Sequence, residues 1–422
     1  MRVLTLSLDK KVLENGSAVQ RRLIALAEEI AEKTEHHPLS SKTRVSPSTE
    51  GERQRKESEA GLTVFVPGER DEKREVSTHL TVHAFGGPKA VQLWKMWRAG
   101  KKHLSGDSSF SKGGGESASR RISNPSSDSE VGVLPLGKGE LTRYDLITVQ
   151  DVYFLGFLAV KLAEKFHISL EVQLHGFEQF SGLRKKMALF VLSKATRVRA
   201  VSQRLKALAV EFGVPAEKVY ILPVYTQIEP QRATKQKTVP YPFTFLTVGR
   251  LVPVKNIALQ IKAFAKLIKQ IPHVRLQIVG GGPELERLKL EARSSKLDEK
   301  ISFEGEQKDV GKFYEEADAF LLTSDRGEGW GLVALEAAAY RLPVIMTNVG
   351  LANEVLHHDK ECIVVPVGDE QQLLGAMKEL VEHPELRERL LKAAYAAFRA
   401  LPSAEEQIAE QVAGWQEIIS RK

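Results

Sequence analysis

Short apolar segments that suit β-strands alternate with segments of helical periodicity through most of this 422-residue chain. Residues 243–248 are strand-like, for example, and the apolar side chains of residues 257–271 then recur at helical spacing. Strands that alternate with helices build parallel sheets whose faces are covered by helices. Because the chain is too long for one ordinary hydrophobic core, we expect an α/β protein with two such sheets, one in each domain.

Two stretches of the first half break the alternation. Residues 34–60 and about 101–135 are rich in small and charged side chains and contain few large apolar ones. Such stretches bury too little surface to offset the entropy of ordering them, so we predict flexible insertions. Lids or lipid-contacting loops are the alternative interpretation.

A stretch rich in Pro, Lys and Gln at residues 224–241 is predicted to link the two domains. The first domain then spans residues 1–223 and the second spans residues 242–400. Residues 401–422 are expected to form a C-terminal helix that crosses back toward the first domain. In open α/β sheets, ligands bind at the carboxyl ends of the strands, so we look there for the site.

The charge of the chain indicates which partners it could bind, and its cysteine content shows whether it could form disulfides. Lys and Arg outnumber Asp and Glu by 61 to 54, which gives a net charge of +7. This excess fits ordinary solubility, or an affinity for anionic partners such as phosphates or a lipid surface. Nucleic acid is disfavoured as a partner, because no basic stripe is interleaved with aromatic residues. A single cysteine, Cys362, excludes disulfides within the chain.

The sequence begins directly with a strand-like segment and contains no apolar span long enough to cross a bilayer. We therefore expect a cytoplasmic protein without a signal peptide. The basic charge, together with Trp94 and Trp97, leaves peripheral contact with the inner face of the membrane open.

The segment from Glu328 to Glu336, EGWGLVALE, carries two carboxylates around two glycines, between a strand-like segment and an Ala-rich helix. This order places the backbone N–H groups of Gly329 to Leu332 at a helix N-terminus, which suits a diphosphate. Carboxylates accept hydrogen bonds from vicinal hydroxyls, so two of them astride a diphosphate site suggest a nucleotide sugar. A helix-capping carboxylate and a surface glutamate are the alternative.

Further polar or glycine-rich segments follow two other predicted strands. Arg250 and Lys255 lie on the loop after one strand, where two cations would neutralise a diphosphate. Three glycines, residues 280–282, follow the next strand and allow close backbone approach to a flat ligand. Two solvated basic side chains and an ordinary glycine turn are the alternative interpretation.

These three motifs, GRLVPVK at 249–255, VGGGP at 279–283 and EGWGLVALE at 328–336, resemble those of the retaining glycosyltransferases of family four. The resemblance is strong over about residues 240–385 and rests on pattern alone in the first half. It implies the GT-B fold, in which a cleft separates two Rossmann-like domains. It also implies transfer of a sugar from a nucleoside diphosphate sugar to a glycan or lipid-linked hydroxyl acceptor with retention, as in polysaccharide biosynthesis.

The resemblance assigns roles to particular residues. Arg250 and Lys255 would hold the diphosphate, Glu328 would contact the donor sugar, Glu336 would bind the ribose, and His175 would face the reacting sugar. We predict Glu328, His175, Arg250 and Lys255 as the catalytic residues. A core or helix-capping role for His175 is the alternative. The implied donor-binding set is Gly249, Arg250, Lys255, Gly281, Gly282, Gly305, Gly329, Trp330, Gly331, Leu332 and Glu336.

Asn15, Gly16 and Ser17 are predicted on the acceptor side together with His175. The family's loop at this place is usually richer in glycine, and Trp330 stands where the family usually has phenylalanine. No Asp-x-Asp signature accompanies these residues, so we expect neither an obligatory metal nor another cofactor.

The alternatives come from other classes. An epimerase or a phosphorylase with the same two-domain layout would use a similar site. A non-catalytic nucleotide- or glycan-binding subunit would keep the binding residues without turnover. A nicotinamide dehydrogenase is disfavoured, because no Gly-x-Gly-x-x-Gly follows the first strand.

Overall fold

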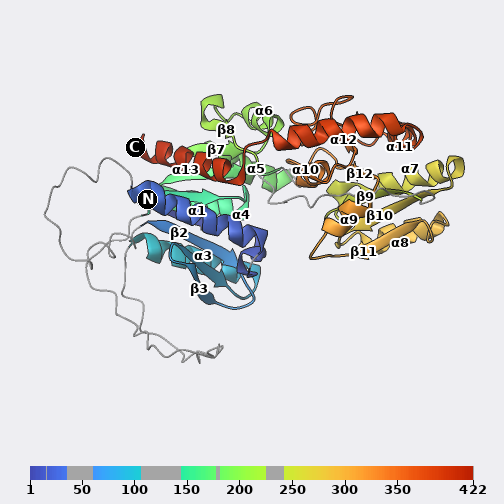
Figure 1. The fold of residues 1–422 in the computed structure, drawn as a ribbon. Coiled ribbons are helices and arrows are strands. Elements are labelled where there is room, and N and C mark those ends of the chain that lie inside the picture. Colours follow the sequence, from blue (N-terminus) through green and yellow to red (C-terminus); the bar gives the residue numbers. More distant parts are fainter. Residues whose placement is uncertain (16, 36–59, 106–143, 177–180, 225–241, 422) are drawn as a thin grey trace, which may run out of the picture. The chain divides into compact units, whose positions relative to one another are not determined.

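The computed structural model describes residues 1–15, 17–35, 60–105, 144–176, 181–224 and 242–421 (Figure 1). Two compact units make up the chain: Met1–Leu170 with Gln416–Lys422, and Glu171–Trp415. Most of the two predicted insertions, and nearly all of the predicted linker at 224–241, lie outside the described residues.

The described part of the first unit contains five strands and the helices that flank them. Its strands are β1 (Arg2–Leu6), β2 (Gly61–Pro67), β3 (Glu72–Ser77), β4 (Leu80–Phe85) and β5 (Leu146–Val149). Its helices are η1 (Lys10–Leu13), α1 (Ala18–Glu35), α3 (Lys89–Ser105) and α4 (Phe154–Phe166).

The second unit holds most of the remaining elements. Its strands are β6 (Ser169–Leu174), β7 (Arg197–Ala200), β8 (Val219–Ile221), β9 (Phe243–Val248), β10 (Val274–Val279), β11 (Ile301–Gly305), β12 (Ala319–Leu322), β13 (Val344–Thr347) and β14 (Ile363–Val365). Its helices are α5 (Gly182–Lys194), α6 (Gln203–Glu211), η3 (Ala216–Lys218), η4 (Pro253–Lys255), α7 (Ile257–Gln270), α8 (Leu285–Ser294), α9 (Gly311–Glu316), α10 (Leu332–Ala339), α11 (Glu370–Glu382), α12 (Pro384–Arg399) and α13 (Ala404–Ser420).

The first sheet has the strand order β3-β4-β2-β1-β5-β6-β7-β8. β1 pairs in parallel with β2 on one side and with β5 on the other, so the chain changes direction across the sheet at β1. The expectation of purely parallel strands is wrong at one edge, where β3 pairs antiparallel with β4. β3 joins β4 through a two-residue turn at residues 78–79, and such a short connection allows only the antiparallel arrangement.

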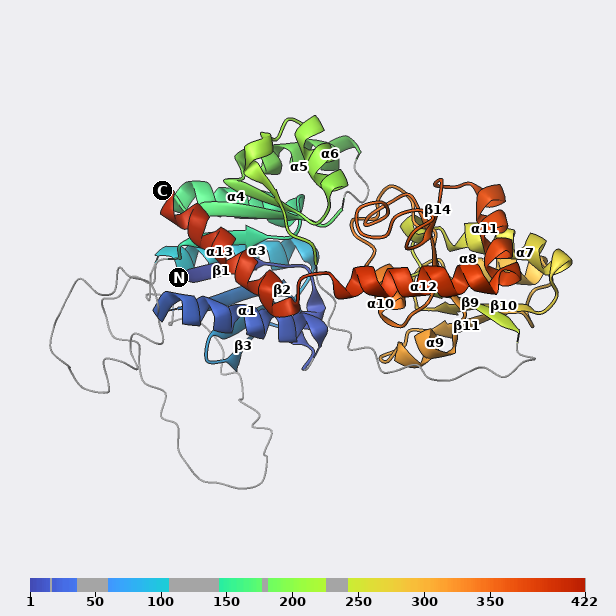
Figure 2. The ribbon, with the colours of Figure 1, turned by 45° about the horizontal axis from the view of Figure 1, so that its top comes forward.

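The second sheet is parallel throughout its described strands and has the order β11-β10-β9-β12-β13-β14. Successive strands are added outward from β9, first β10 and β11 on one side, then β12, β13 and β14 on the other. The order therefore reverses between β9 and β12, and such a switch point is where open α/β sheets bind ligands. On this sheet α12 runs alongside α10 (Figure 2).

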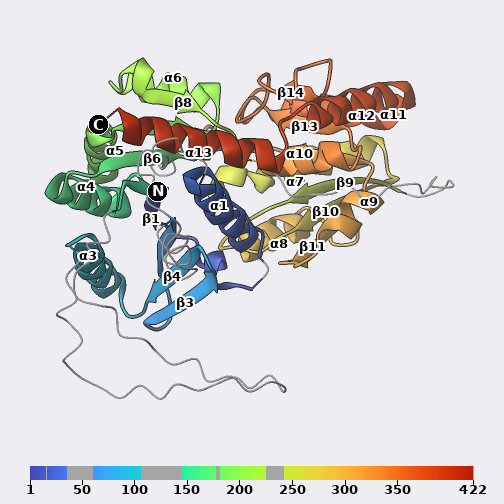
Figure 3. The same cartoon turned by 60° about the vertical axis from the view of Figure 1, so that its left-hand side comes forward.

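Helix α3 is longer than the sequence indicated. Residues 101–105, predicted to begin the second insertion, are its last turn. Met96, Gly100 and Leu104 are buried at intervals of four residues, so the buried face continues to the end of the helix. α3 lies beside α4 (Figure 3).

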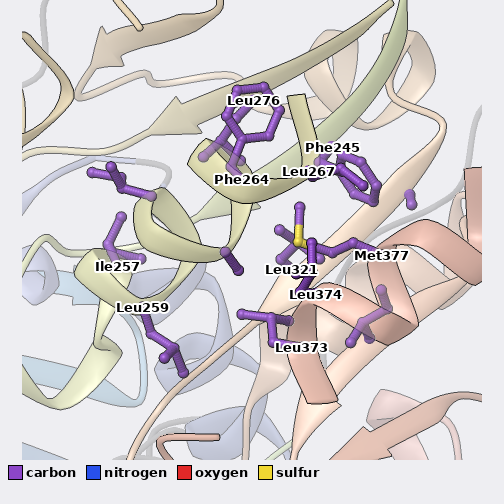
Figure 4. Packing of buried hydrophobic residues seen from close by; sticks show 14 of the residues in the cluster. Phe245, Ile257, Leu259, Phe264, Leu267, Leu276, Leu321, Leu373, Leu374 and Met377 are labelled. Carbon is purple, nitrogen blue, oxygen red and sulfur yellow. The ribbon is translucent and has the colours of Figure 1, made fainter. Parts of the chain in front are cut away.

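The second sheet is held by a hydrophobic core between its strands and helices α7, α8 and α11. Phe245 of β9, Phe264 of α7 and Met377 of α11 are completely buried in it (Figure 4). Burial of each such side chain stabilises the fold by roughly 1.5–3 kcal/mol. This core fixes β9 and β12, the two strands at the switch point.

Helix α13 is tied to β6 and β7 by buried polar contacts. Glu171 of β6 is completely buried and accepts hydrogen bonds from Trp415 Nε1 at 2.9 Å and from the Tyr220 hydroxyl at 2.6 Å. Arg199 of β7 donates to the Gln411 side chain at 2.9 Å. Burial of a carboxylate costs free energy unless the group is hydrogen-bonded. Helix α13 lowers this cost for Glu171 of β6, because its Trp415 donates a hydrogen bond to the carboxylate.

Two histidines lie in contact between β4 and α3 in the first unit. The rings of His83 and His103 meet edge to face with their centroids 4.8 Å apart, next to Phe65. His103 Nδ1 lies 3.3 Å from the Tyr144 hydroxyl, which itself donates to Thr63 at 2.8 Å. Burial lowers the pKa of both histidines from 6.5 to about 4, so both rings are neutral at pH 7.

This pair predicts acid-sensitive stability. Between pH 6.5 and 4 the unfolded chain binds protons that the folded chain excludes, so lowering the pH through this range favours unfolding. We expect the melting temperature to fall across that range, and to fall less steeply in His83→Gln/His103→Gln. Thermal unfolding followed by circular dichroism at constant ionic strength measures both slopes. An unchanged slope in the double variant would contradict the prediction.

Candidate functional site

The loop after β9 is fastened to the loop after β12. The backbone N–H of Asp325 donates to the Val254 carbonyl at 2.8 Å, and the Thr323 hydroxyl donates to the Lys255 carbonyl at 3.1 Å. Thr323 is held in turn by the buried amide of Gln260 at 2.8 Å. These contacts bring residues on opposite sides of the switch point together and position the end of η4.

Lys255 and Glu328 form an ion pair at this place. Lys255 Nζ contacts Glu328 Oε2, and the Ser324 hydroxyl donates to the same oxygen at 2.8 Å. The two charged side chains are only 18% and 12% exposed. Water therefore screens the pair weakly, and its charges act more strongly on a nearby ligand than surface charges would. The sequence placed both residues at this edge of the sheet but did not indicate their pairing or the role of Ser324.

A cavity of about 260 Å³ adjoins the ion pair. It is lined by His175, Val201, Val224, Lys255, Glu328, Trp330, Gly331, Leu332 and Val333. Three of the four residues predicted as catalytic thus line one cavity, together with the first residues of α10. The first N–H groups of a helix have no partner within the helix, so the cavity combines a cation, a carboxylate and a helix N-terminus.

Glycines let the backbone pass closely around this cavity. A Cβ atom on Gly329 would lie 1.6 Å from the His175 carbonyl oxygen, so no other residue fits there. Gly331 precedes α10 with a φ of 89°, a conformation that glycine adopts readily. The Trp330 carbonyl accepts from the Leu351 N–H at 2.9 Å, and the indole is only 6% exposed. Trp330, predicted to bind the donor, is therefore buried, and it also lines the cavity.

Glu336 lies about one turn inside α10, as the sequence predicted. Its partner from α9 was not predicted from the sequence. The Tyr314 hydroxyl donates to Glu336 Oε2 at 2.8 Å, and the Tyr314 ring stacks on Tyr340 with centroids 5.2 Å apart. Burial raises the pKa of the Glu336 carboxyl, and the hydrogen bond from Tyr314 opposes that rise. Burial also raises the pKa of Tyr314 well above its usual value, so the tyrosine keeps the proton that it donates.

The glycines after β9, β10 and β11 meet at one place. A Cβ on Gly280 would lie 1.9 Å from the Gly249 oxygen, and the Gly280 N–H donates to the Gly305 carbonyl at 2.8 Å. Gly281 accepts from the Leu251 N–H at 2.8 Å. A Cβ on the next residue, Gly282, would collide with the Leu251 backbone. Arg250 lies on the same loop, directly after Gly249, with an exposed side chain.

The predicted acceptor-side residues Asn15 and Ser17 belong to the first unit, and Gly16 lies outside the described residues. Ser17 precedes α1 and caps it, because its hydroxyl accepts from the Gln20 N–H at 3.1 Å. Asn15 is exposed.

The described residues contain neither a metal-binding cluster nor a membrane-crossing helix. No group of three or more His, Cys, Asp or Glu side chains in this part of the chain could hold a metal ion. Among the helices described, none combines the length and the apolar character needed to cross a bilayer.

Residues 230–397, which contain the cavity's ion pair, α10 and the glycine loops, match the family described as glycosyl transferases group 1. The chain is similar to that family over this segment. The match covers the second sheet, where the three motifs lie.

Individual relatives resemble parts of this chain. N-acetyl-alpha-D-glucosaminyl L-malate synthase of Bacillus anthracis is 28% identical over 188 residues, which are 44% of this chain and 48% of that protein. Phosphatidyl-myo-inositol mannosyltransferase of Mycobacterium leprae is 31% identical over 159 residues, 37% of this chain and 42% of that protein. The matches thus span about half, or less, of the length of these curated relatives.

A solved structure matches the chain over nearly its whole length. Anabaena HepE, crystallised in complex with UDP and glucose, superposes with a TM-score of 0.68 at 18% identity, and the match covers 99% of each chain. This likeness confirms the predicted GT-B fold.

The ion pair makes a prediction for stability. Removal of one partner leaves the other charge poorly hydrated and without its hydrogen bond, so Lys255→Met and Glu328→Gln should each lower the free energy of unfolding by about 1–3 kcal/mol. The double variant should lose less free energy of unfolding than the sum of the two single losses, because neither charge is then left without its partner. Urea unfolding of the four proteins measures this coupling. Additive losses would show that the two side chains do not interact appreciably.

Proposed function

We propose that this glycosyltransferase moves a sugar from a nucleoside diphosphate sugar to a hydroxyl acceptor, with retention of the anomeric configuration. The observation that carries the proposal is the Lys255–Glu328 pair beside the start of α10, in a cavity of about 260 Å³ at the sheet's switch point. Anion-binding N–H groups and a carboxylate that accepts from hydroxyls there suit a sugar diphosphate.

The diphosphate would lie against Lys255 and the first N–H groups of α10, with Arg250 reaching it from the loop after β9. Negative charge gathers on the diphosphate as the glycosidic bond breaks, so fixed positive groups stabilise the transition state more than the ground state. HepE, named as a complex with UDP and glucose, supports such a donor. We expect catalysis without an obligatory metal.

Glu328 and His175 would face the transferred sugar, because both line the cavity next to the diphosphate position. Glu328 already holds Lys255 and Ser324 through Oε2. It would orient a sugar hydroxyl and keep the ammonium of Lys255 in place. We propose no covalent glycosyl-enzyme; the acceptor hydroxyl attacks the face from which the diphosphate leaves.

Glu336 would bind the ribose hydroxyls at the other end of the donor. Its carboxylate is held by Tyr314, which fixes one oxygen by donating to it. Ribose hydroxyls would donate to the carboxylate and favour its charged form, which burial disfavours in the free protein. The glycines after β10 and β11 would border the base, since they leave room close to the backbone.

The acceptor is proposed to be a glycan or a lipid-linked hydroxyl. The name of one relative, phosphatidyl-myo-inositol mannosyltransferase, supports a lipid-linked acceptor. A lipid-linked acceptor would require the protein to work in the cytoplasm at a membrane surface.

The central test is transfer by Glu328→Gln. Purified protein is screened by thermal shift against nucleoside diphosphates and their sugars, and the stabilising donor is then incubated with candidate acceptors. We expect a glycoside with retained configuration by NMR from wild type, and a loss of turnover of about 100-fold or more in Glu328→Gln.

Glu286→Gln is the matched control, because Glu286 is strongly exposed and pairs only with a neighbouring lysine on α8. Wild-type turnover in Glu328→Gln would overturn the assigned role. An epimerised donor or a sugar phosphate as the product would overturn the proposed reaction in favour of the related enzyme classes. Donor binding without any turnover would indicate a non-catalytic subunit.

If Glu336 binds the donor as a carboxylate, donor binding should depend on pH. Burial raises its pKa, so its carboxylate takes up a proton at a higher pH than an ordinary glutamate. We expect calorimetric affinity for the nucleoside diphosphate to fall as the pH is lowered through that pKa. Tyr314→Phe should move the fall to higher pH, because it removes the bond that lowers the pKa. Glu336→Gln should remove the part of the pH dependence that comes from this carboxyl. An identical pH profile of binding in the wild type, Tyr314→Phe and Glu336→Gln would exclude Glu336 from the site.

A further inference from the structure

Helices α3 and α4 of the first unit pack directly against each other (Figure 3). Gly100 of α3 makes this possible, since a Cβ there would lie 2.7 Å from the Leu162 side chain of α4. Met96 and Leu104 are buried on the same side of α3 as Gly100. The exposed side chains of both helices lie outside this contact, on what we call the outer surface of the pair.

That outer surface is unusually apolar. Among the described residues, eight large hydrophobic side chains are exposed, and four of them lie on these two helices. They are Val91 and Trp94 of α3, with 41% and 55% exposure, and Phe154 and Phe157 of α4, with 52% and 41%. Within each helix the pair is spaced at one turn, so it forms a stripe. Scattered single apolar residues are ordinary on a protein surface, but such a cluster marks an interaction site.

Each stripe continues into basic residues one turn later. The guanidinium of Arg98 lies 5.4 Å from the centre of the Trp94 ring, and Lys161 Nζ lies 5.7 Å from the centre of the Phe157 ring. Lys101 stands in the same way over Trp97 at 5.5 Å. Cation–π contacts of this kind hold the aromatic rings in place and leave the charged ends at the surface.

Basic residues predominate on this surface, although Lys95 of α3 is paired with Asp71. α3 contains five basic residues and no acidic one. The sequence of α4 contains a single acidic residue, Glu164, which is paired with Lys161 at 3.1 Å. A partner that covers this surface must accept aromatic side chains and carry negative charge.

We propose that this lipid-binding face, composed of Val91, Trp94, Arg98, Phe154, Phe157 and Lys161, binds the surface of a bilayer that contains anionic lipids. Aromatic rings sit favourably at the level of the headgroups, where one end of the side chain is apolar and the other wet. Basic residues beside them are attracted to anionic headgroups. The two helices lie in the plane of the interface and do not cross the bilayer. The assignment uses no residue of the donor site, so its failure would leave the proposed transferase function untouched.

The test is flotation of the full chain with vesicles. We expect binding to vesicles of phosphatidylcholine with about 30% phosphatidylglycerol, a composition that gives the surface a negative potential, and weak binding to phosphatidylcholine alone. Raising the salt concentration should weaken binding because it screens the charges. Equal binding to both compositions, or to neither, would overturn the proposal.

Variants separate the contribution of the aromatic side chains to membrane binding from that of the basic side chains. Trp94→Ala/Phe157→Ala should weaken binding by about tenfold or more, because apolar area at the interface is lost. Arg98→Gln/Lys161→Gln should weaken it by about fivefold for each charge removed. Leu290→Ala is the matched control: this leucine is 65% exposed on α8 of the second unit and belongs to neither helix of the face, so its loss should leave binding unchanged. Unchanged melting temperature and donor binding in every variant exclude misfolding as the cause.

Tryptophan fluorescence supplies an independent readout. Trp330 and Trp415 are buried, so a shift of emission on vesicle addition reports on Trp94 and Trp97. We expect a blue shift in wild type that is much smaller in Trp94→Phe, although this variant still floats with vesicles. Full flotation of Trp94→Ala/Phe157→Ala would overturn the proposal. So would equal, Trp94-independent binding to a soluble polyanion, because it would identify the surface as a general site for acidic macromolecules.

Discussion

The parallel pairing of β9 with β10 on one side and β12 on the other is the constraint on which the site depends. Parallel strands end at the same edge of a sheet, and a reversal of strand order leaves two neighbouring loops with no helix between them. Lys255 follows β9 and Glu328 follows β12, although they lie 73 positions apart in the chain. Their meeting is a consequence of sheet topology, which the hydrophobic core beneath the strands maintains.

Precision within the site comes from a smaller set of buried polar contacts. The Thr323 hydroxyl bonds to the carbonyls of Lys255 and Asn256, and the Gln260 amide completes the arrangement. Each buried donor would cost free energy if left without a partner, so these side chains favour one loop conformation over others. The glycines have the complementary effect, because they remove side chains where two backbone segments must touch. Together they hold a charged pair in a weakly hydrated place without further support from the ligand.

Much of this arrangement could be predicted from the residues alone. Alternating strand and helix patterns predicted both sheets, and the glycine-rich segments after predicted strands located the loops around Lys255 and Glu328. Periodicity could not reveal β3, because its sequence EKREVS is charged and its burial alternates only weakly. Nor could spacing reveal Tyr314 as the partner of Glu336, since α9 and α10 meet only through the tertiary packing. The end of α3 was missed because Lys101 and Lys102 resemble the polar stretch that follows. The burial of Leu104 extends the buried face of the helix to its last turn.

The contact between Glu171 and Trp415 has a consequence for the order in which the chain assembles. The two residues are 244 positions apart, so the ribosome completes β6 long before the indole that serves its buried carboxylate exists. Until then Tyr220 and Gln173 can donate to the carboxylate, but the indole donor is missing. The complete hydrogen bonding of this buried carboxylate is therefore possible only after α13 has been made.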